Sequence, residues 1–219
     1  MKKSLFWSAV DKFGFVLIQF GSIVILSRIL GPKIIGEFSI VQIFVSFGLI
    51  FLSSGFIQSL IRKNEVSENE YSTFFWFNLL TALGVYAIIY SLSATISSFF
   101  NLKSLANVLK YLSLVIPIYS LSNVHLGLLQ KRLEFKKISI ATLIASATSS
   151  ILAILYSLND KSIAPLVLQL LSYHIVRSSL LCYLQKLKIG LVFKVEYIKE
   201  HALFAYGLTA TSFISVIAV

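Results

Sequence analysis

The sequence predicts an all-α integral membrane protein with a lobe of six transmembrane helices and the start of a seventh helix. Its 219 residues are 57% hydrophobic and only 13% charged, whereas soluble domains are about 25% charged. Residues 71–102 contain no Asp, Glu, Lys or Arg over 32 positions, and about 20 apolar residues cross a bilayer. Five other apolar stretches fill most of the remaining chain, and a sixth reaches its C-terminus.

Span 1 is expected at residues 6–30, and it ends at Gly31-Pro32, a pair that stops a helix. Asp11 and Lys12 interrupt the apolar run that follows the N-terminal lysines. We therefore interpret this segment as an uncleaved span and not as a signal peptide. The other spans are expected at residues 34–61, 71–99, 111–130, 138–158 and 162–185.

These spans divide the chain into three parts. Residues 1–185 are expected to form a six-helix lobe. Residues 186–201 are expected to form a cytoplasmic amphipathic link. Residues 202–219 start a second lobe and stop without a charged anchor, so we expect a truncated larger transporter. A natural seven-span protein is the alternative.

The basic residues predict the orientation, since cytoplasmic loops carry an excess of Lys and Arg. With the N-terminus inside, the hinges hold 12 basic residues on the cytoplasmic side and 4 outside. We therefore interpret the 19 Lys and Arg against 9 Asp and Glu as a topology signal and expect no nucleic-acid partner. The predicted location is a bacterial cytoplasmic membrane, with a multi-pass chain and a cytoplasmic N-terminus.

No catalytic motif is evident. The sequence has no phosphate-binding Gly-rich loop with Lys, no His-x-x-x-His pair and no Gly-x-Ser-x-Gly elbow. Cys182 is the only cysteine, which excludes an intrachain disulfide and a cysteine-based metal site. We therefore expect no enzyme, no cofactor and no metal. Energy would come from an ion gradient or from the substrate gradient.

Span 1 carries a polar stripe. Asp11, Lys12 and Gln19 fall with two serines within about one third of the helix circumference. Ionisable residues at the bilayer centre are costly and usually face a cavity or a partner. The stripe is a candidate wall of a solvated cavity. Alternatively, Asp11 and Lys12 lie near the cytoplasmic interface, paired or snorkelling.

Span 6 carries the most informative charge, Arg177. It is expected roughly 12 Å from the cytoplasmic helix end at 1.5 Å per residue. Gln169, Tyr173 and Arg177 recur every fourth residue, with His174 beside them, which predicts one polar ridge. A guanidinium in a cavity suits a diphosphate, which it binds bidentately. Alternatively, Arg177 holds carbonyl groups of a neighbouring helix.

Two further residues are weaker candidates for a substrate cavity. Arg28 lies near the outer end of span 1, where an interface anchor is the simpler interpretation. His125 lies within span 4 beside Asn123, where a hydrogen bond between helices is more typical than proton transfer.

Four stretches of the chain form a joint pattern. The first stretch is Trp7-Ser8-Ala9 with residues 26–32 and Gly36. The others are Ser54-Gly55-Phe56 with residues 59–63, residues 72–78 and residues 129–137. Their order and spacing cover nearly the whole chain. Together they resemble polysaccharide-export flippases of the Wzx type. These flippases form the polysaccharide-transporter branch of the multidrug/oligosaccharidyl-lipid/polysaccharide exporter superfamily, whose members have a MATE-like fold of two lobes.

The resemblance implies the function. It implies transfer of a polyprenyl-diphosphate-linked oligosaccharide repeat unit across the cytoplasmic membrane for O-antigen, capsule or exopolysaccharide synthesis. It also implies membrane lipid and polysaccharide-assembly proteins as partners, and H⁺ or Na⁺ as coupling ions. The chain then corresponds to the N-terminal half of such a flippase, and alternating access between two lobes moves the substrate.

Three other functions remain open at this stage. An ion-coupled multidrug antiporter of the same superfamily is expected to place carboxylates in its cavity, and Asp11 is the main candidate. A membrane-embedded glycan polymerase or transferase needs a large outer loop, and the predicted outer loops have about ten residues or fewer. A non-catalytic membrane scaffold is the third.

Overall fold

The computed structural model describes residues 2–53, 56–63, 66–102 and 104–199. Those residues are helical and contain no strand, and six of the helical segments are long and apolar enough to cross a membrane. The predicted fold class is therefore confirmed. The predicted seventh span, residues 202–219, lies outside the described residues.

The first helix, α1 (Lys2–Leu30), is followed after one residue by α2 (Pro32–Ser53). Gly31 lies between them with a φ of 83°, a left-handed conformation that glycine adopts without a steric penalty. Pro32 then begins α2, where its missing N–H costs nothing. The Gly-Pro stop predicted from the sequence is confirmed.

The predicted second span is described in two helical segments. Helix α2 is described to Ser53 and a short α3 covers Phe56–Arg62, while residues 54–55 between them lie outside the described residues. The side chain of Asn123 donates a hydrogen bond to the Leu52 carbonyl oxygen at 2.8 Å. This bond ties α6 to the last turn of α2. The expectation of one continuous helix over residues 34–61 stays a prediction, because residues 54–55 lie outside the described residues.

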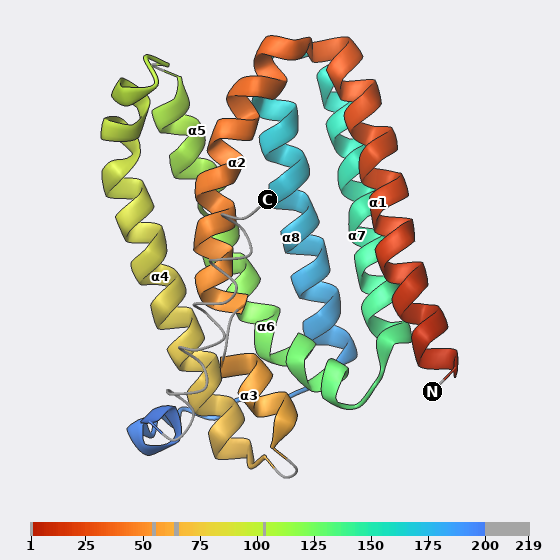
Figure 1. Ribbon diagram of the computed structural model, residues 1–219, viewed down its shortest axis with the longest axis vertical. Helices are drawn as coiled ribbons and strands as arrows, with labels where there is room; N and C mark the ends of the chain where they lie inside the picture. The colour runs from red at the N-terminus through yellow and green to blue at the C-terminus, as the bar shows by residue number, and fades with distance from the viewer. Residues whose placement is uncertain (1, 54–55, 64–65, 103, 200–219) are drawn as a thin grey trace.

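The remaining helices alternate between the two ends of the lobe (Figure 1). They are α4 (Glu68–Phe99), α5 (Leu105–Leu112), α6 (Val115–Lys131), α7 (Phe135–Ser157) and α8 (Ala164–Leu184). Helices α5 and α6 together form the fourth apolar segment. The N-terminus, α3 and the loop after α6 lie at the lower end in Figure 1, whereas the turns after α1, α4 and α7 lie at the upper end. The basic hinges that predicted the orientation therefore share one end.

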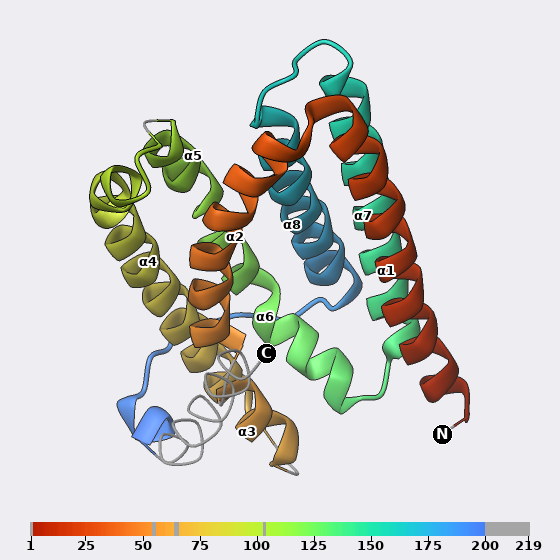
Figure 2. The ribbon, with the colours of Figure 1, turned by 45° about the horizontal axis from the view of Figure 1, so that its top comes forward.

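Helix α7 lies between α1 and α8 and makes its most extensive contacts with them, as both views show (Figures 1 and 2). Every fourth residue of one α7 face is small and completely buried: Ala141, Ala145, Ser149, Ala153 and Ser157. Small residues let helix backbones approach closely in a membrane. On the facing helix, a Cβ added at Gly14 would lie 2.6 Å from Leu143 Cδ2. This part of the lobe is therefore tightly packed.

Helix α2 diverges from this group. It packs against α4, α5 and α6, and its contact with α1 is small. Its buried face contributes Phe38, Val41 and Val45 to the main hydrophobic core. The divergence leaves a space that α1, α2 and α8 bound.

The segment after α8 crosses the beginning of α4. Ser72 Oγ accepts a hydrogen bond from the Gly190 N–H at 2.9 Å, and the Trp76 indole donates to the Gly190 carbonyl at 3.0 Å. Thr73 Oγ1 accepts from the Lys194 N–H at 3.2 Å. Residues 186–194 are irregular, and 195–199 are helical. The role of residues 186–201 as a link between lobes stays a prediction, and residues 200–201 lie outside the described residues.

Candidate functional site

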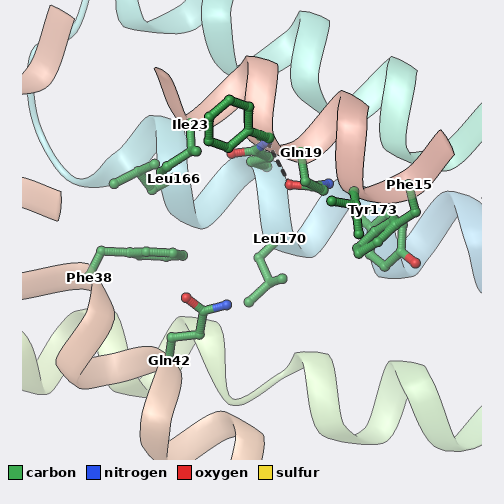
Figure 3. Close-up of a pocket in the computed structure, with 11 residues that line it drawn as sticks. Phe15, Gln19, Ile23, Phe38, Gln42, Leu166, Leu170 and Tyr173 are labelled. Atoms are coloured by element: carbon green, nitrogen blue, oxygen red, sulfur yellow. Dashed lines mark hydrogen bonds between the residues drawn. The ribbon is translucent and has the colours of Figure 1, made fainter. Parts of the chain in front are cut away.

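A cavity of about 360 Å³ lies between α1, α2 and α8. Aromatic side chains from all three helices form much of its wall: Phe15, Phe20, Phe38 and Tyr173. The rings of Phe15 and Tyr173 pack together with centroids 5.4 Å apart, and Figure 3 shows this pair at one end of the cavity. The remaining wall is largely aliphatic. Small-molecule sites are typically of this size and character, apolar with a few placed polar groups.

Three glutamines supply the polar groups of the cavity. The Gln169 amide nitrogen lies 2.8 Å from Ser22 Oγ, 3.3 Å from Ser150 Oγ and 3.3 Å from Gln19 Oε1. Gln169 therefore ties α8 to α1 and α7 and orients the Gln19 amide. Gln42 of α2 points into the cavity beside Leu170 and Phe38 (Figure 3). Neither of its amide atoms is hydrogen-bonded to a described residue.

The charged candidates lie about one helical turn beyond this cavity. Arg177 is partly buried, and its Nε donates a hydrogen bond to Thr142 Oγ1 of α7 at 3.3 Å. Tyr173 lies within electrostatic reach of both Arg177 and Asp11. Asp11 Oδ1 is shielded from solvent and accepts no hydrogen bond from a described residue. Lys12 is exposed on α1.

The structure separates the predicted polar ridge of α8 into two groups. Gln169 and Tyr173 line the cavity. His174 is buried against two rings, Tyr119 at 6.0 Å and Tyr173 at 5.0 Å between centroids. Arg177 is not among the residues that line the cavity. The ridge differs from the prediction because α8 has α6 and α7 on one side and the cavity on another.

Two other candidates lie apart from the cavity. Arg28 is exposed in the last turn of α1, at the end of the lobe opposite the N-terminus. His125 is buried in α6, and its Nδ1 lies 3.8 Å from Cys182 Sγ of α8. That contact joins two helices, which is the alternative considered for His125.

The sequence reasoning missed the polar face of α2. Ser39, Gln42 and Ser46 are exposed and share one helix face. They line a second hollow of about 490 Å³, and Gln42 belongs to both hollows. The signal was available in the sequence, since spacings of three and four place these residues together on an otherwise apolar span. It was overlooked because none of the three is charged.

The described lining of the cavity contains amides, a phenol and aromatic rings, and no charged side chain. Amides both donate and accept hydrogen bonds, and aromatic rings provide broad apolar surfaces. The charges of Asp11, Lys12 and Arg177 lie toward the N-terminal end of α1. The site therefore has a neutral part and an adjoining ionic part.

Relatives of this chain include a transport protein and a biosynthesis protein named for polysaccharides. The chain is 27% identical over 203 residues to the succinoglycan biosynthesis transport protein ExoT of Rhizobium meliloti, covering 92% of this chain and 41% of the relative. It is 27% identical over 218 residues to an uncharacterized membrane protein in the cps region of Klebsiella pneumoniae, covering 98% and 45%. It is 26% identical over 147 residues to the lipopolysaccharide biosynthesis protein WzxC of Escherichia coli, covering 67% and 29%.

The chain thus spans less than half the length of these curated relatives. No solved structure matches the chain significantly. The family model described as polysaccharide biosynthesis protein matches residues 25–219, which is most of the chain. The resemblance identified from the sequence motifs is confirmed at this level. With its membrane-spanning helices and its relatives among transport proteins, the chain belongs to the polysaccharide biosynthesis protein family.

Proposed function

We propose that this chain is the N-terminal lobe of a flippase for a polyprenyl-diphosphate-linked oligosaccharide. The observation that carries the proposal is the cavity between α1, α2 and α8, whose wall carries three amides and a phenol inside a lobe with a strongly apolar outer surface. Phe13 and Leu17 on α1, for example, are 72% and 69% exposed, as suits contact with lipid. A lipid-linked saccharide combines the same two chemistries, a polar head and an apolar tail.

The ionic part of the site is proposed to bind the diphosphate. Arg177 can grip two phosphate oxygens with its planar guanidinium, and Lys12, exposed on α1, is a second basic candidate. The single hydrogen bond from Arg177 Nε to Thr142 leaves the terminal guanidinium nitrogens without a bond to a described residue. A second lobe is proposed to close the site from the opposite side, so that alternating access moves the head group.

With the N-terminus in the cytoplasm, the ionic part lies toward the cytoplasmic leaflet, where lipid-linked repeat units are assembled. Transport toward the periplasmic leaflet then begins at Arg177. The protein acts in this proposal as a transporter and not as an enzyme, with H⁺, Na⁺ or the substrate gradient as the source of energy.

The test uses the complete gene in a strain from which it has been deleted. Wild type should restore surface polysaccharide, and Arg177→Ala should reduce it by at least tenfold with normal membrane abundance. Arg177→Lys should restore only part, because lysine keeps the charge and loses the bidentate fork. Arg132→Ala, an exposed arginine after α6, is the matched control and should export normally.

One observation favours a second candidate function, an ion-coupled antiporter. Asp11 Oδ1 is buried without a hydrogen-bond partner among the described residues, and a carboxylate in that position attracts a cation. The same strains distinguish the two functions. If the deletion strain loses resistance to ethidium and keeps its surface polysaccharide, the antiporter is supported and the flippase proposal is wrong.

A further inference from the structure

We infer that the neutral cavity is a sugar-binding subsite, distinct from the ionic site for the diphosphate, and that Gln42 is its main recognition residue. The inference rests on the proposed function and refines it, because it divides the lipid-linked saccharide between two places in the lobe. Sugar is assigned to the part bounded by α1, α2 and α8, and diphosphate to the part around Arg177.

The first argument is charge. None of the described residues that line the cavity is ionisable near neutral pH, since the phenol of Tyr173 is neutral there. A buried diphosphate requires cationic or strongly donating partners, because an unpaired buried charge is very costly. A sugar carries hydroxyl groups and no charge, so neutral amides match it without that cost.

The second argument is the state of the amides. Neither amide atom of Gln42 is hydrogen-bonded to a described residue, and the side chain points into the cavity (Figure 3). Gln19 Oε1 accepts a hydrogen bond from the Gln169 amide nitrogen. The Gln19 amide nitrogen can then donate a hydrogen bond to a ligand. An uncommitted amide offers a donor and an acceptor together, which fits adjacent hydroxyl groups of a sugar ring. Gln169, whose nitrogen has three neighbouring acceptors, is a positioning residue.

The third argument is the aromatic wall. Phe15 and Tyr173 pack together at one end of the cavity, and Phe38 extends into it from α2 (Figure 3). The C–H face of a sugar ring is apolar and packs on such rings, whereas its hydroxyl edge needs the amides. Tyr173 lines the neutral cavity and lies within electrostatic reach of Asp11 and Arg177. It therefore marks the boundary between the sugar and the diphosphate.

The fourth argument is the continuation along α2. Ser39 and Ser46 flank Gln42 on the exposed face of α2 and line the adjoining hollow of about 490 Å³. Polar side chains on a membrane helix are unfavourable against lipid, so this face is suited to a solvated path. The first sugar is placed in the cavity, and further sugars of the repeat unit extend along this face.

The test measures binding to the full-length protein in nanodiscs. The probes are a polyprenyl diphosphate without sugar and a panel of the same lipid carrying one hexose or one N-acetylhexosamine. Wild type should bind at least one sugar-bearing probe more tightly than the sugar-free lipid. Gln42→Met, which keeps the length of the side chain and removes the amide, should weaken that preference by roughly 3- to 10-fold, the usual effect of one or two hydrogen bonds.

Affinity for the sugar-free lipid is the internal control for folding and should be unchanged by Gln42→Met. Gln58→Met, the same substitution at an exposed position of α3, should change neither affinity. Arg177→Ala should weaken all probes equally. If Gln42→Met weakens the sugar-free probe as much as the others, or if wild type shows no preference for any sugar, the subsite is refuted while the flippase remains. If wild type binds none of the lipids, the proposed function itself is refuted.

Discussion

Helices α2 and α7 have the same mean hydropathy, 2.0, and nearly the same length, yet they are used differently. Half of an 18-residue apolar stretch of α7 is buried inside the lobe, against 22% of such a stretch of α2. The serines of α7, such as Ser146 and Ser149, are completely buried, whereas Ser39 and Ser46 of α2 are exposed. Hydropathy thus predicts that both helices cross the membrane. It does not distinguish a helix packed inside the lobe from one whose polar face lines a hollow.

The physical difference lies in what the small polar residues contact. On α7 they allow α1 and α8 to approach, and they bond within the lobe: Ser139 Oγ donates to the Trp7 carbonyl at 2.6 Å, and Thr142 accepts from Arg177. On α2 the polar side chains line hollows, and Ser39 Oγ bonds only to its own helix, at the Ile35 carbonyl 2.9 Å away. The small polar residues of α7 are therefore used in packing between helices, whereas those of α2 remain available to contact a ligand.

The strongest test of this comparison is Ser149→Leu in α7. Ser149 is 0% exposed, so a larger side chain has no space between α7 and its neighbours. Overpacking of this kind costs about 1–3 kcal/mol, and we expect the upper end of that range. Thermal unfolding in detergent and membrane abundance should both fall. An unchanged unfolding temperature would show that the close packing of α7 is not needed for stability.

A smaller loss is expected for Asn123→Ala, which removes the hydrogen bond to the Leu52 carbonyl at the end of α2. A buried acceptor left without a partner costs about 1–3 kcal/mol, and we expect about 2 kcal/mol. Unfolding in detergent is again the measurement. Asn107→Ala, on the exposed side of α5, is the control and should have little effect. Equal effects of both variants would mean that the end of α2 does not depend on α6.

The smallest change is expected for Ser46→Leu, the same substitution as in the α7 test. Because Ser46 is exposed on α2, the free energy of unfolding should change by less than about 0.5 kcal/mol. Surface polysaccharide, measured in the deletion strain, should nevertheless decrease, since leucine makes the polar face of α2 apolar. A loss of stability as large as that of Ser149→Leu would contradict the comparison of the two helices.

Much of the fold follows from the sequence because membrane insertion depends on local composition. Apolar stretches of sufficient length predicted the six spans, and Gly31-Pro32 predicted the turn between α1 and α2 correctly. The charged hinges predicted which loops share one end of the lobe. The backbone must satisfy its own hydrogen bonds in lipid, so helix follows directly from hydropathy.

Part of the candidate site also followed from the sequence. Gln19, Gln169 and Tyr173 were selected as polar residues on apolar helices, and the structure places all three at one cavity. Arg177 and His174 belong to the same stretch of α8 but do not line the cavity. Arg177 is hydrogen-bonded to Thr142, and the ring of His174 packs against Tyr119. Their assignment to a substrate remains a proposal.

Only the tertiary structure decided the hydrogen bond between α6 and α2, the divergence of α2 from α1 and the exposure of Gln42. That bond joins Leu52 to Asn123, which is 71 residues away along the chain. The exposure of Gln42 depends on α8, which lies across the cavity from it. Periodicity shows which residues share a helix face. Which faces are covered depends on how separate helices pack, and that packing is set by contacts between residues far apart in sequence.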